Sequence, residues 1–166
     1  MKTLPRMRRH LLTGKAAGRR AFPPATLAAI QAAIADGEAR HRAEIRVIIE
    51  TRLATGAVLR GTAARERAHQ LFVEYQVWDT EENCGVLLYV NLADHKVEIV
   101  ADRAVARLLR QDEWQGVCAT MTAGFARGEY QASALAALEQ LNALLAERFP
   151  ADGERENQLP DRPIVL

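Results

Sequence analysis

Carboxylates are the side chains of this sequence whose positions best suit them to act together. The candidate group consists of five acids that flank two apolar segments: Asp79, Glu81, Glu82, Asp102 and Asp112. Carboxylates a few ångströms apart repel one another unless a cation or protons compensate, and Ca²⁺ accepts such a cluster of loop oxygens. The sequence therefore suggests a calcium site. The alternative is that the acidic loops are solvated and that Asp102 and Asp112 cap helices.

No other residue type forms a catalytic pattern. The sequence contains no Gly-x-Ser-x-Gly motif, no phosphate-binding glycine-rich loop and no Cys-x5-Arg loop. The cysteines, Cys84 and Cys118, have no metal-binding spacing, so we expect two buried thiols in a reducing compartment. The histidines are scattered and include no pair at the spacing of metal ligands: His10, His41, His69 and His95.

Two apolar segments place the acids at one edge of a sheet. Residues 84–90 form an apolar run too short for a buried helix, and Lys96–Ala101 alternates between apolar and polar residues, with turn residues between the two segments. This pattern predicts an antiparallel hairpin. Because the first strand begins where the second ends, Glu82 and Asp102 should lie at the same edge.

A third strand is expected at Ile45–Glu50, which is rich in β-branched residues. The segment after it carries an apolar stripe at helical spacing that ends at Tyr75, so a helix should connect this strand to residues 84–90. Such a crossover is right-handed and makes the two strands parallel neighbours.

Helices fill most of the remaining sequence. The pattern predicts helices from Pro24 to about His41, from an N-cap at Thr62 to Tyr75, from Asp102 or Arg103 to Leu109, from an N-cap at Asp112 to Gly128, and from Tyr130 to Phe149. The expected fold is α/β: a three-layer sandwich whose small mixed sheet, a parallel pair plus an antiparallel hairpin, has helices on both faces. We divide the chain into a basic N-terminal arm at 1–22, an α/β domain at 23–150 and an extended C-terminal tail at 151–166.

The segment Glu82-Asn83-Cys84-Gly85-Val86-Leu87-Leu88, followed by the hairpin, resembles the core motif of the TPM domain. This is the family of the thylakoid acid phosphatase, the photosystem II repair protein and the acetylcholine-receptor auxiliary protein. The resemblance covers roughly Pro24 to Phe149 and implies calcium near the acidic edge in some members. The chain departs from the family in one place. The typical domain has a glycine-containing turn after the last hairpin strand, whereas residues 100–105 contain no glycine.

Positive charge is concentrated at the N-terminus. Residues 1–20 contain seven Lys and Arg and no acid, which leaves 15 of the 22 bases against 21 acids in the rest of the chain, a net charge of −6. Such an arm suits an anionic membrane surface, contacted through residues 2–20. The alternative is that the arm lies against the protein's own acidic surface. We expect a short helix around Arg8–Leu12.

Three functions compete. The first is a non-enzymatic interaction module of TPM type with an unidentified protein partner, as the anchored and auxiliary members of the family suggest. The second is a metal-dependent phosphomonoesterase, also implied by the resemblance; the missing glycine turn and the lack of a clear general acid or nucleophile weigh against it. The third is nucleic-acid binding through the arm, which lacks interleaved aromatic residues.

The expected location is cytoplasmic and peripheral to the membrane. Many TPM proteins have an export signal and an apolar anchor. Here the basic N-terminus is not followed by the apolar core of a signal peptide. No apolar run approaches the roughly 20 residues that span a bilayer.

Overall fold

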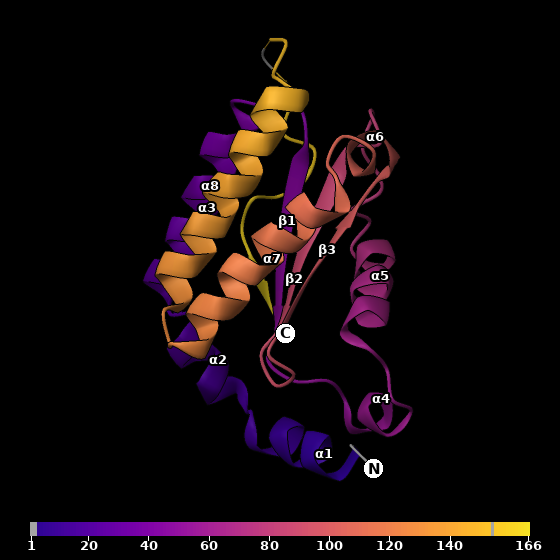
Figure 1. Cartoon of the computed structure of the whole chain (residues 1–166), viewed down its shortest axis with the longest axis vertical. Helices are drawn as coiled ribbons and strands as arrows, with labels where there is room; N and C mark the ends of the chain where they lie inside the picture. The colour runs from indigo at the N-terminus through magenta and orange to yellow at the C-terminus, as the bar shows by residue number, and fades with distance from the viewer. Residues whose placement is uncertain (1–2, 154) are drawn as a thin grey trace.

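The protein is described by a computed structural model that covers residues 3–153 and 155–166 (Figure 1). Its helices are α1 (Thr3–Leu12), α2 (Lys15–Ala21), α3 (Pro24–Glu38), α4 (Thr55–Leu59), α5 (Ala64–Glu74), α6 (Arg103–Ala106), α7 (Gln111–Ala126) and α8 (Tyr130–Arg148). Its strands are β1 (Glu44–Glu50), β2 (Gly85–Asn91), β3 (Lys96–Ala101) and β4 (Ile164–Val165). The first three strands lie within one residue of their predicted bounds.

The sheet has the strand order β3-β2-β1-β4. β1 pairs in parallel with β2, and β2 pairs antiparallel with β3, which confirms the predicted parallel pair plus hairpin. The registers place Ile48 opposite Tyr89 and Leu88 opposite Ile99. The carboxyl ends of β1 and β2 therefore lie at one end of the sheet. Their amino ends lie at the other, together with the carboxyl end of β3.

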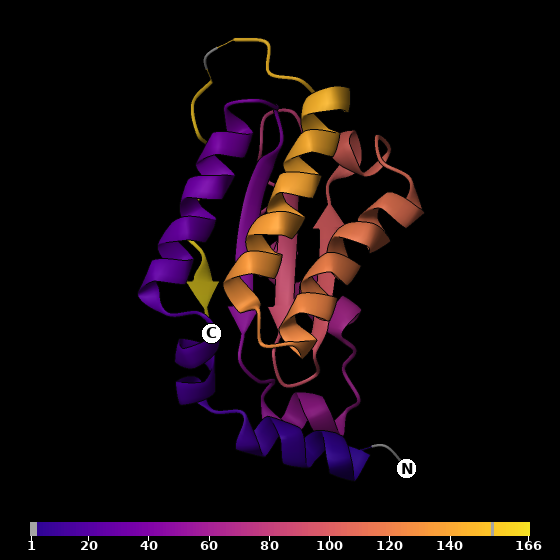
Figure 2. The ribbon, with the colours of Figure 1, turned by 60° about the vertical axis from the view of Figure 1, so that its left-hand side comes forward.

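Helices cover both faces of this sheet, which confirms the predicted three-layer sandwich. Figures 1 and 2 show α3, α7 and α8 over one face and α5 over the other. Each strand contributes side chains to the helix layers on both faces, because successive side chains of a strand point to opposite faces of the sheet. In β2, Val86 and Leu88 pack with α3, α7 and α8, whereas Leu87 and Tyr89 pack in the cluster under α5.

Gly85 opens β2 because the chain passes very close to it. A Cβ atom at this position would lie 1.8 Å from the carbonyl oxygen of Val77, a distance that no side chain tolerates. The preceding Asn83 has a φ of 54°, in the left-handed region that asparagine adopts more readily than most residues. The Asn83-Cys84-Gly85 sequence thus lets the loop after α5 turn tightly into the central strand.

Of the three residues predicted to cap helix N-termini, Asp102 does so, whereas Thr62 and Asp112 do not. Asp102 caps α6, since its Oδ1 accepts a hydrogen bond at 2.6 Å from the next backbone N–H. Thr62 does not cap α5, which has no side-chain bond at its N-cap. Asp112 is not the N-cap of α7 either, because Arg110 takes that position and Glu113 accepts its backbone N–H at 2.7 Å.

The basic N-terminal segment is mostly helical. The short helix expected around Arg8–Leu12 is longer, since α1 begins at Thr3, and α2 follows it. α1 lies across the end of the sheet where β1 and β2 terminate and packs against α4 (Figure 2). Lys2 of the arm lies outside the described residues. None of the helices in the described part of the chain is long and apolar enough to cross a bilayer.

The C-terminal segment runs back along the β1 side of the sheet. Glu44 Oε2 accepts the backbone N–H groups of Gln158 and Leu159, at 3.1 and 2.9 Å. β4 then adds in parallel to β1, and Leu166 N–H donates to the carbonyl oxygen of Ile49 at 2.8 Å. One edge of the sheet is therefore covered by the chain's own extended end.

Candidate functional site

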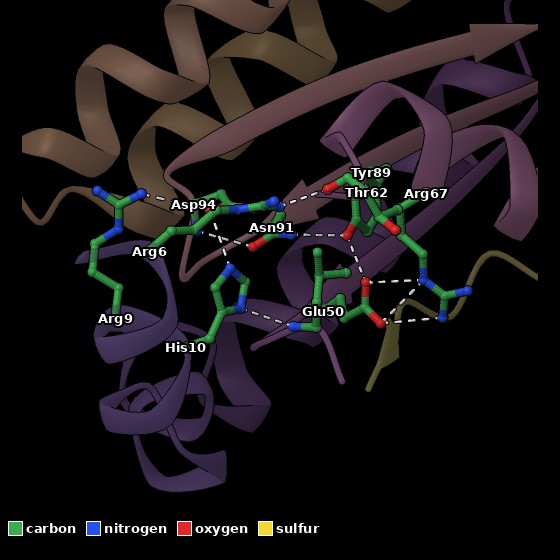
Figure 3. A network of polar contacts seen from close by, with 10 residues as sticks. Arg6, Arg9, His10, Glu50, Thr62, Arg67, Tyr89, Asn91 and Asp94 are labelled. Carbon is green, nitrogen blue, oxygen red and sulfur yellow. Dashed lines mark hydrogen bonds and ion pairs between the residues drawn. The ribbon is translucent and has the colours of Figure 1, made fainter. Parts of the chain in front are cut away.

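A buried polar network occupies the carboxyl ends of β1 and β2 (Figure 3). In α/β sheets, ligands bind outside the carboxyl ends of parallel strands, which makes this end a place to look for a site. The network joins the two strand ends, the β2–β3 turn, α5 and α1. The residues that Figure 3 labels are Arg6, Arg9, His10, Glu50, Thr62, Arg67, Tyr89, Asn91 and Asp94.

Glu50 is the centre of one half of the network. Its carboxylate accepts a hydrogen bond from the Tyr89 hydroxyl at 2.5 Å and pairs with the Arg67 guanidinium at 3.1 Å. Asn91 donates from Nδ2 to the Tyr89 oxygen at 3.2 Å and accepts the backbone N–H of Asp94 at 3.0 Å. Glu50 and Asn91 are both buried, so these bonds replace the water that the groups have lost.

Asp94 is the centre of the other half. Arg6 donates to it from Nη2 at 2.6 Å and from Nε at 2.9 Å, and also donates to the carbonyl oxygen of Thr62 at 2.7 Å. The Nε2 atom of the buried His10 lies 3.1 Å from Asp94 Oδ1. Nδ1 of the same ring accepts the backbone N–H of Leu53 at 3.0 Å, so the neutral ring carries its proton on Nε2, facing Asp94.

The surroundings hold these groups in fixed protonation states. Burial and the negative charge of Glu50 raise the pKa of Tyr89, so the phenol stays protonated. Burial alone would raise the pKa of Asp94, but the hydrogen bonds from Arg6 and His10 outweigh it and lower the pKa. Tyr89 and Asp94 already have hydrogen-bond partners within the chain. Neither the phenol of Tyr89 nor the carboxylate of Asp94 has a pKa suited to proton transfer near neutral pH. The network is best suited to tying α1 to the strand ends.

The acids predicted as a site lie away from this network, and the structure does not gather them. Asp102 N–H donates to Gly85 O, and Ala104 N–H donates to Asn83 O, so the loops before β2 and after β3 meet as expected. The Asp102 side chain, however, is used to cap α6. Asp112 lies in the first turn of α7 in an exposed ion pair with Arg110.

The other three predicted acids are on the surface or in ion pairs. Glu82 pairs with Arg42 at 2.9 Å and also with Arg155. The two exposed acids are Asp79 and Glu81. Within residues 3–153 and 155–166, no three His, Cys, Asp or Glu side chains come together in a way that could hold a metal ion. The acidic edge therefore consists of separate ion pairs rather than a ligand cluster.

The cysteines offer no reactive thiol. Both are free; Cys84 is buried and Cys118 is half-buried. Burial raises the pKa of Cys84, and it raises that of Cys118 to about 11. Because the thiolate is the nucleophilic form, neither residue is activated at neutral pH.

The sequence contained one signal for the network that the prediction did not use. Glu50 and Asn91 are polar residues that end strands predicted to be buried and parallel, so they had to lie side by side. By local sequence alone, Asp94 is a turn residue and His10 is one of four scattered histidines. No local pattern indicates that Arg6 would reach Asp94, which is 88 positions away.

Residues 18–144 match the family model of the TPM domain, which is most of the chain. The chain belongs to the TPM domain family. The match begins after α1, so the helix that closes the polar network lies outside the matched TPM segment.

Among solved structures, the TPM chain is similar to BA42, a protein of the psychrophilic bacterium Bizionia argentinensis whose structure was determined by NMR. The two share 24% sequence identity with a TM-score of 0.74, over 84% of this chain and 92% of BA42. At this identity the likeness shows a common fold. No curated protein matches the chain.

Proposed function

We propose that this TPM chain is a non-enzymatic interaction module that lies at an anionic, cytoplasmic membrane surface through α1. The observation that carries the proposal is the two-sided character of this helix. Its inner side, with Arg6 and His10, is bonded to Asp94 of the domain. Its outer side leaves three leucines unpacked: Leu4, Leu11 and Leu12 are 84%, 60% and 72% exposed.

Cations accompany the exposed leucines. Arg8 and Arg9 of α1 are exposed, and both border an open, mostly apolar depression together with Leu4 and Leu12. Arg9 also reaches Asp94, at 3.6 Å, so Arg8 is the cation of the pair that faces away from the domain. α4, which packs against α1, adds Leu59 at 65% exposure. Apolar side chains flanked by arginines are typical of helices that lie in the membrane interface. The rest of the chain has a net charge of −6, so this end should face the membrane and the domain should face away.

The proposal that the module is non-enzymatic is based on the protonation and pairing of its side chains. The carboxylates of Glu50 and Asp94 are paired with arginines, the thiols are protonated, and the predicted acidic edge is divided into separate ion pairs. An interaction role requires none of the activated groups that a hydrolase needs.

The test is co-sedimentation with vesicles of phosphatidylcholine alone and of phosphatidylcholine mixed with phosphatidylserine. We expect binding to the anionic vesicles only, lost at high salt and lost when residues 2–20 are deleted. Each cation near the surface contributes about 1 kcal/mol, so an Arg8→Gln/Arg9→Gln double variant should bind about 30-fold more weakly.

The matched control removes the same charge elsewhere. Arg103→Gln/Arg107→Gln neutralises two exposed arginines in and beside α6, at the opposite end of the sheet (Figure 1). This variant should bind vesicles as the wild type does. Absence of binding to anionic vesicles at low salt, or equal weakening by both double variants, would refute the membrane role of α1.

A further inference from the structure

The two edges of the sheet differ in whether another strand lies beside them. The β1 edge is covered by β4, whereas the outer edge of β3 has no strand beside it in the described residues. β3 has six residues and contains neither a proline nor a bulge. Native edge strands usually carry such features, or charged side chains, to prevent pairing with other chains. The β3 edge carries Lys96 and Glu98 as its only such protection, and strand addition requires no change in its backbone.

The register identifies the backbone groups that this edge presents. Asp102 N–H donates to Gly85 O, directly across the hairpin, and hydrogen-bonded pairs alternate along an antiparallel ladder. Val97, Ile99 and Ala101 consequently direct their N–H and C=O groups away from β2. The Ile99 carbonyl points away from β2 as this register requires, because it accepts a hydrogen bond from the Arg65 side chain of α5.

A cleft of about 410 Å³ runs beside this edge between α5 and α7. Its α7 side combines Leu109, the half-buried Trp114 and Cys118 with the side chains of Gln111 and Gln115. Its α5 side is polar and contains Arg65, whose side chain is 53% exposed, and Glu98. Arg65 and Glu98 form an ion pair at 3.7 Å, and Lys96 is exposed on the same face of the strand as Glu98, so these three residues carry a net positive charge.

We propose that the β3 edge and this cleft bind an extended peptide segment of a protein partner by strand addition. Successive side chains of an added strand point to opposite faces. Those on the α7 side should be apolar, to cover Trp114, and those on the α5 side should be acidic, to pair with Arg65 and Lys96. The backbone of the peptide would bond to Val97 and Ala101, on either side of the Ile99 carbonyl oxygen that the Arg65 side chain already occupies, as in other complexes formed by strand addition.

This inference rests on the proposed function, since it supplies the protein partner of an interaction module, but it uses a separate surface. Vesicle binding depends on α1, and peptide binding would depend on β3. A failure of one therefore leaves the other measurable.

The test is selection of a random peptide library displayed on phage against the immobilised full-length chain. We expect enriched peptides in which apolar and acidic residues alternate. In NMR titrations, these peptides should shift the amide signals of residues 97–101 and the indole signal of Trp114. Methylation of alternate peptide nitrogens should abolish binding, because it removes the backbone donors of the added strand.

Two protein variants, each with a matched control variant, test the location of the peptide site. Ala101→Pro removes an outward N–H without removing a bond to β2, so it should keep the fold and lose the selected peptides. Ala101→Val retains the N–H and is its control. Arg65→Ala should weaken binding about tenfold through loss of a charge-assisted hydrogen bond, whereas Arg60→Ala, at an exposed arginine outside the cleft, should not.

Three outcomes would overturn the proposal. The first is the absence of any peptide that prefers the wild type over Ala101→Pro. The second is that the selected peptides shift signals elsewhere on the molecule. The third is a concentration-dependent dimer of the wild type, detected by analytical ultracentrifugation and lost in Ala101→Pro, which would assign the edge to a second copy of this chain.

Discussion

The two ends of the sheet hold acids of the same kinds in opposite situations. At the carboxyl end of β1 and β2, Glu50 and Asp94 are largely removed from water and paired with Arg67 and Arg6. At the amino end, Glu82 pairs with arginines near the surface, with 29% of its side chain exposed. Both ends bring distant parts of the chain together, but the acids at the carboxyl end are shielded from water, whereas Glu82 is partly exposed. A cluster of acids in a sequence therefore does not distinguish a metal or catalytic site from a set of stabilising ion pairs until the burial of each acid is known.

The largest loss of stability expected from this comparison is that of Asp94→Ala. Removal of the carboxylate leaves the half-buried Arg6 guanidinium without its anion and the buried His10 Nε2 without its neighbour, which should lower the free energy of unfolding by about 3 kcal/mol. α1 should also detach from the strand ends. Urea unfolding measures the first effect, and increased hydrogen exchange of the amides of residues 3–12 measures the second.

Glu82→Ala at the other end of the sheet is the matched control, with an expected change within about 0.5 kcal/mol because surface ion pairs contribute little. An Arg6→Met substitution in the Asp94→Ala background should recover part of the lost stability, since it removes the unpaired cation. If Asp94→Ala and Glu82→Ala cost the same, the contrast between the two ends of the sheet is wrong.

A pH-dependent effect is expected from Glu38, an acid at the amino end of the sheet that is shielded from water. Glu38, the last residue of α3, accepts the backbone N–H of Ile45 at 2.7 Å. Burial, opposed by this hydrogen bond and reinforced by the negative charges of Glu44 and Asp161, raises the pKa of Glu38 from 4.5 to about 9. The folded protein therefore holds this proton more tightly than the unfolded chain does. The stability that depends on it falls as the pH rises from 4.5 through 9.

Glu38→Gln keeps the acceptor for Ile45 and cannot ionise. We expect the variant to be more stable than the wild type by several kcal/mol at pH 8, since each pH unit above 4.5 contributes about 1.4 kcal/mol, and the difference to shrink toward pH 5. Urea unfolding across this pH range measures it. Asp36→Asn, an exposed acid on the same helix, should show no such trend. A difference between Glu38→Gln and wild type that is constant with pH would mean that Glu38 is ionised in the folded protein.

The smallest expected effect concerns the five acids of the predicted calcium or phosphatase site. Because they lie in separate ion pairs or on the surface, we expect little hydrolysis of a generic phosphomonoester, with or without Ca²⁺ or Mg²⁺. We also expect Ca²⁺ to leave the thermal unfolding midpoint unchanged. Metal-dependent turnover, or a calcium-induced rise in the midpoint, that disappears in Glu82→Gln or Asp102→Asn would reverse this conclusion.

Local patterns in the sequence were sufficient for much of the fold. The apolar run at 84–90 and the alternation at Lys96–Ala101 predicted the hairpin, because strand periodicity and turn residues act over short distances. The helix between Ile45–Glu50 and that run predicted the parallel pair, because crossovers have a fixed hand. Cap positions were less certain, and Asp112 shows why: its neighbour Glu113 made the capping contact instead.

What the sequence could not determine was which charged groups meet. Asp94 is a turn residue by every local criterion, and Arg6 belongs to a basic segment that could equally have faced water. Tertiary docking of α1 decided the outcome, because a half-buried guanidinium and a carboxylate that has lost its water each need the other. Periodicity specifies the strands and helices from neighbours in sequence. The pairing of charges depends on distances between elements that exist only once the chain has folded.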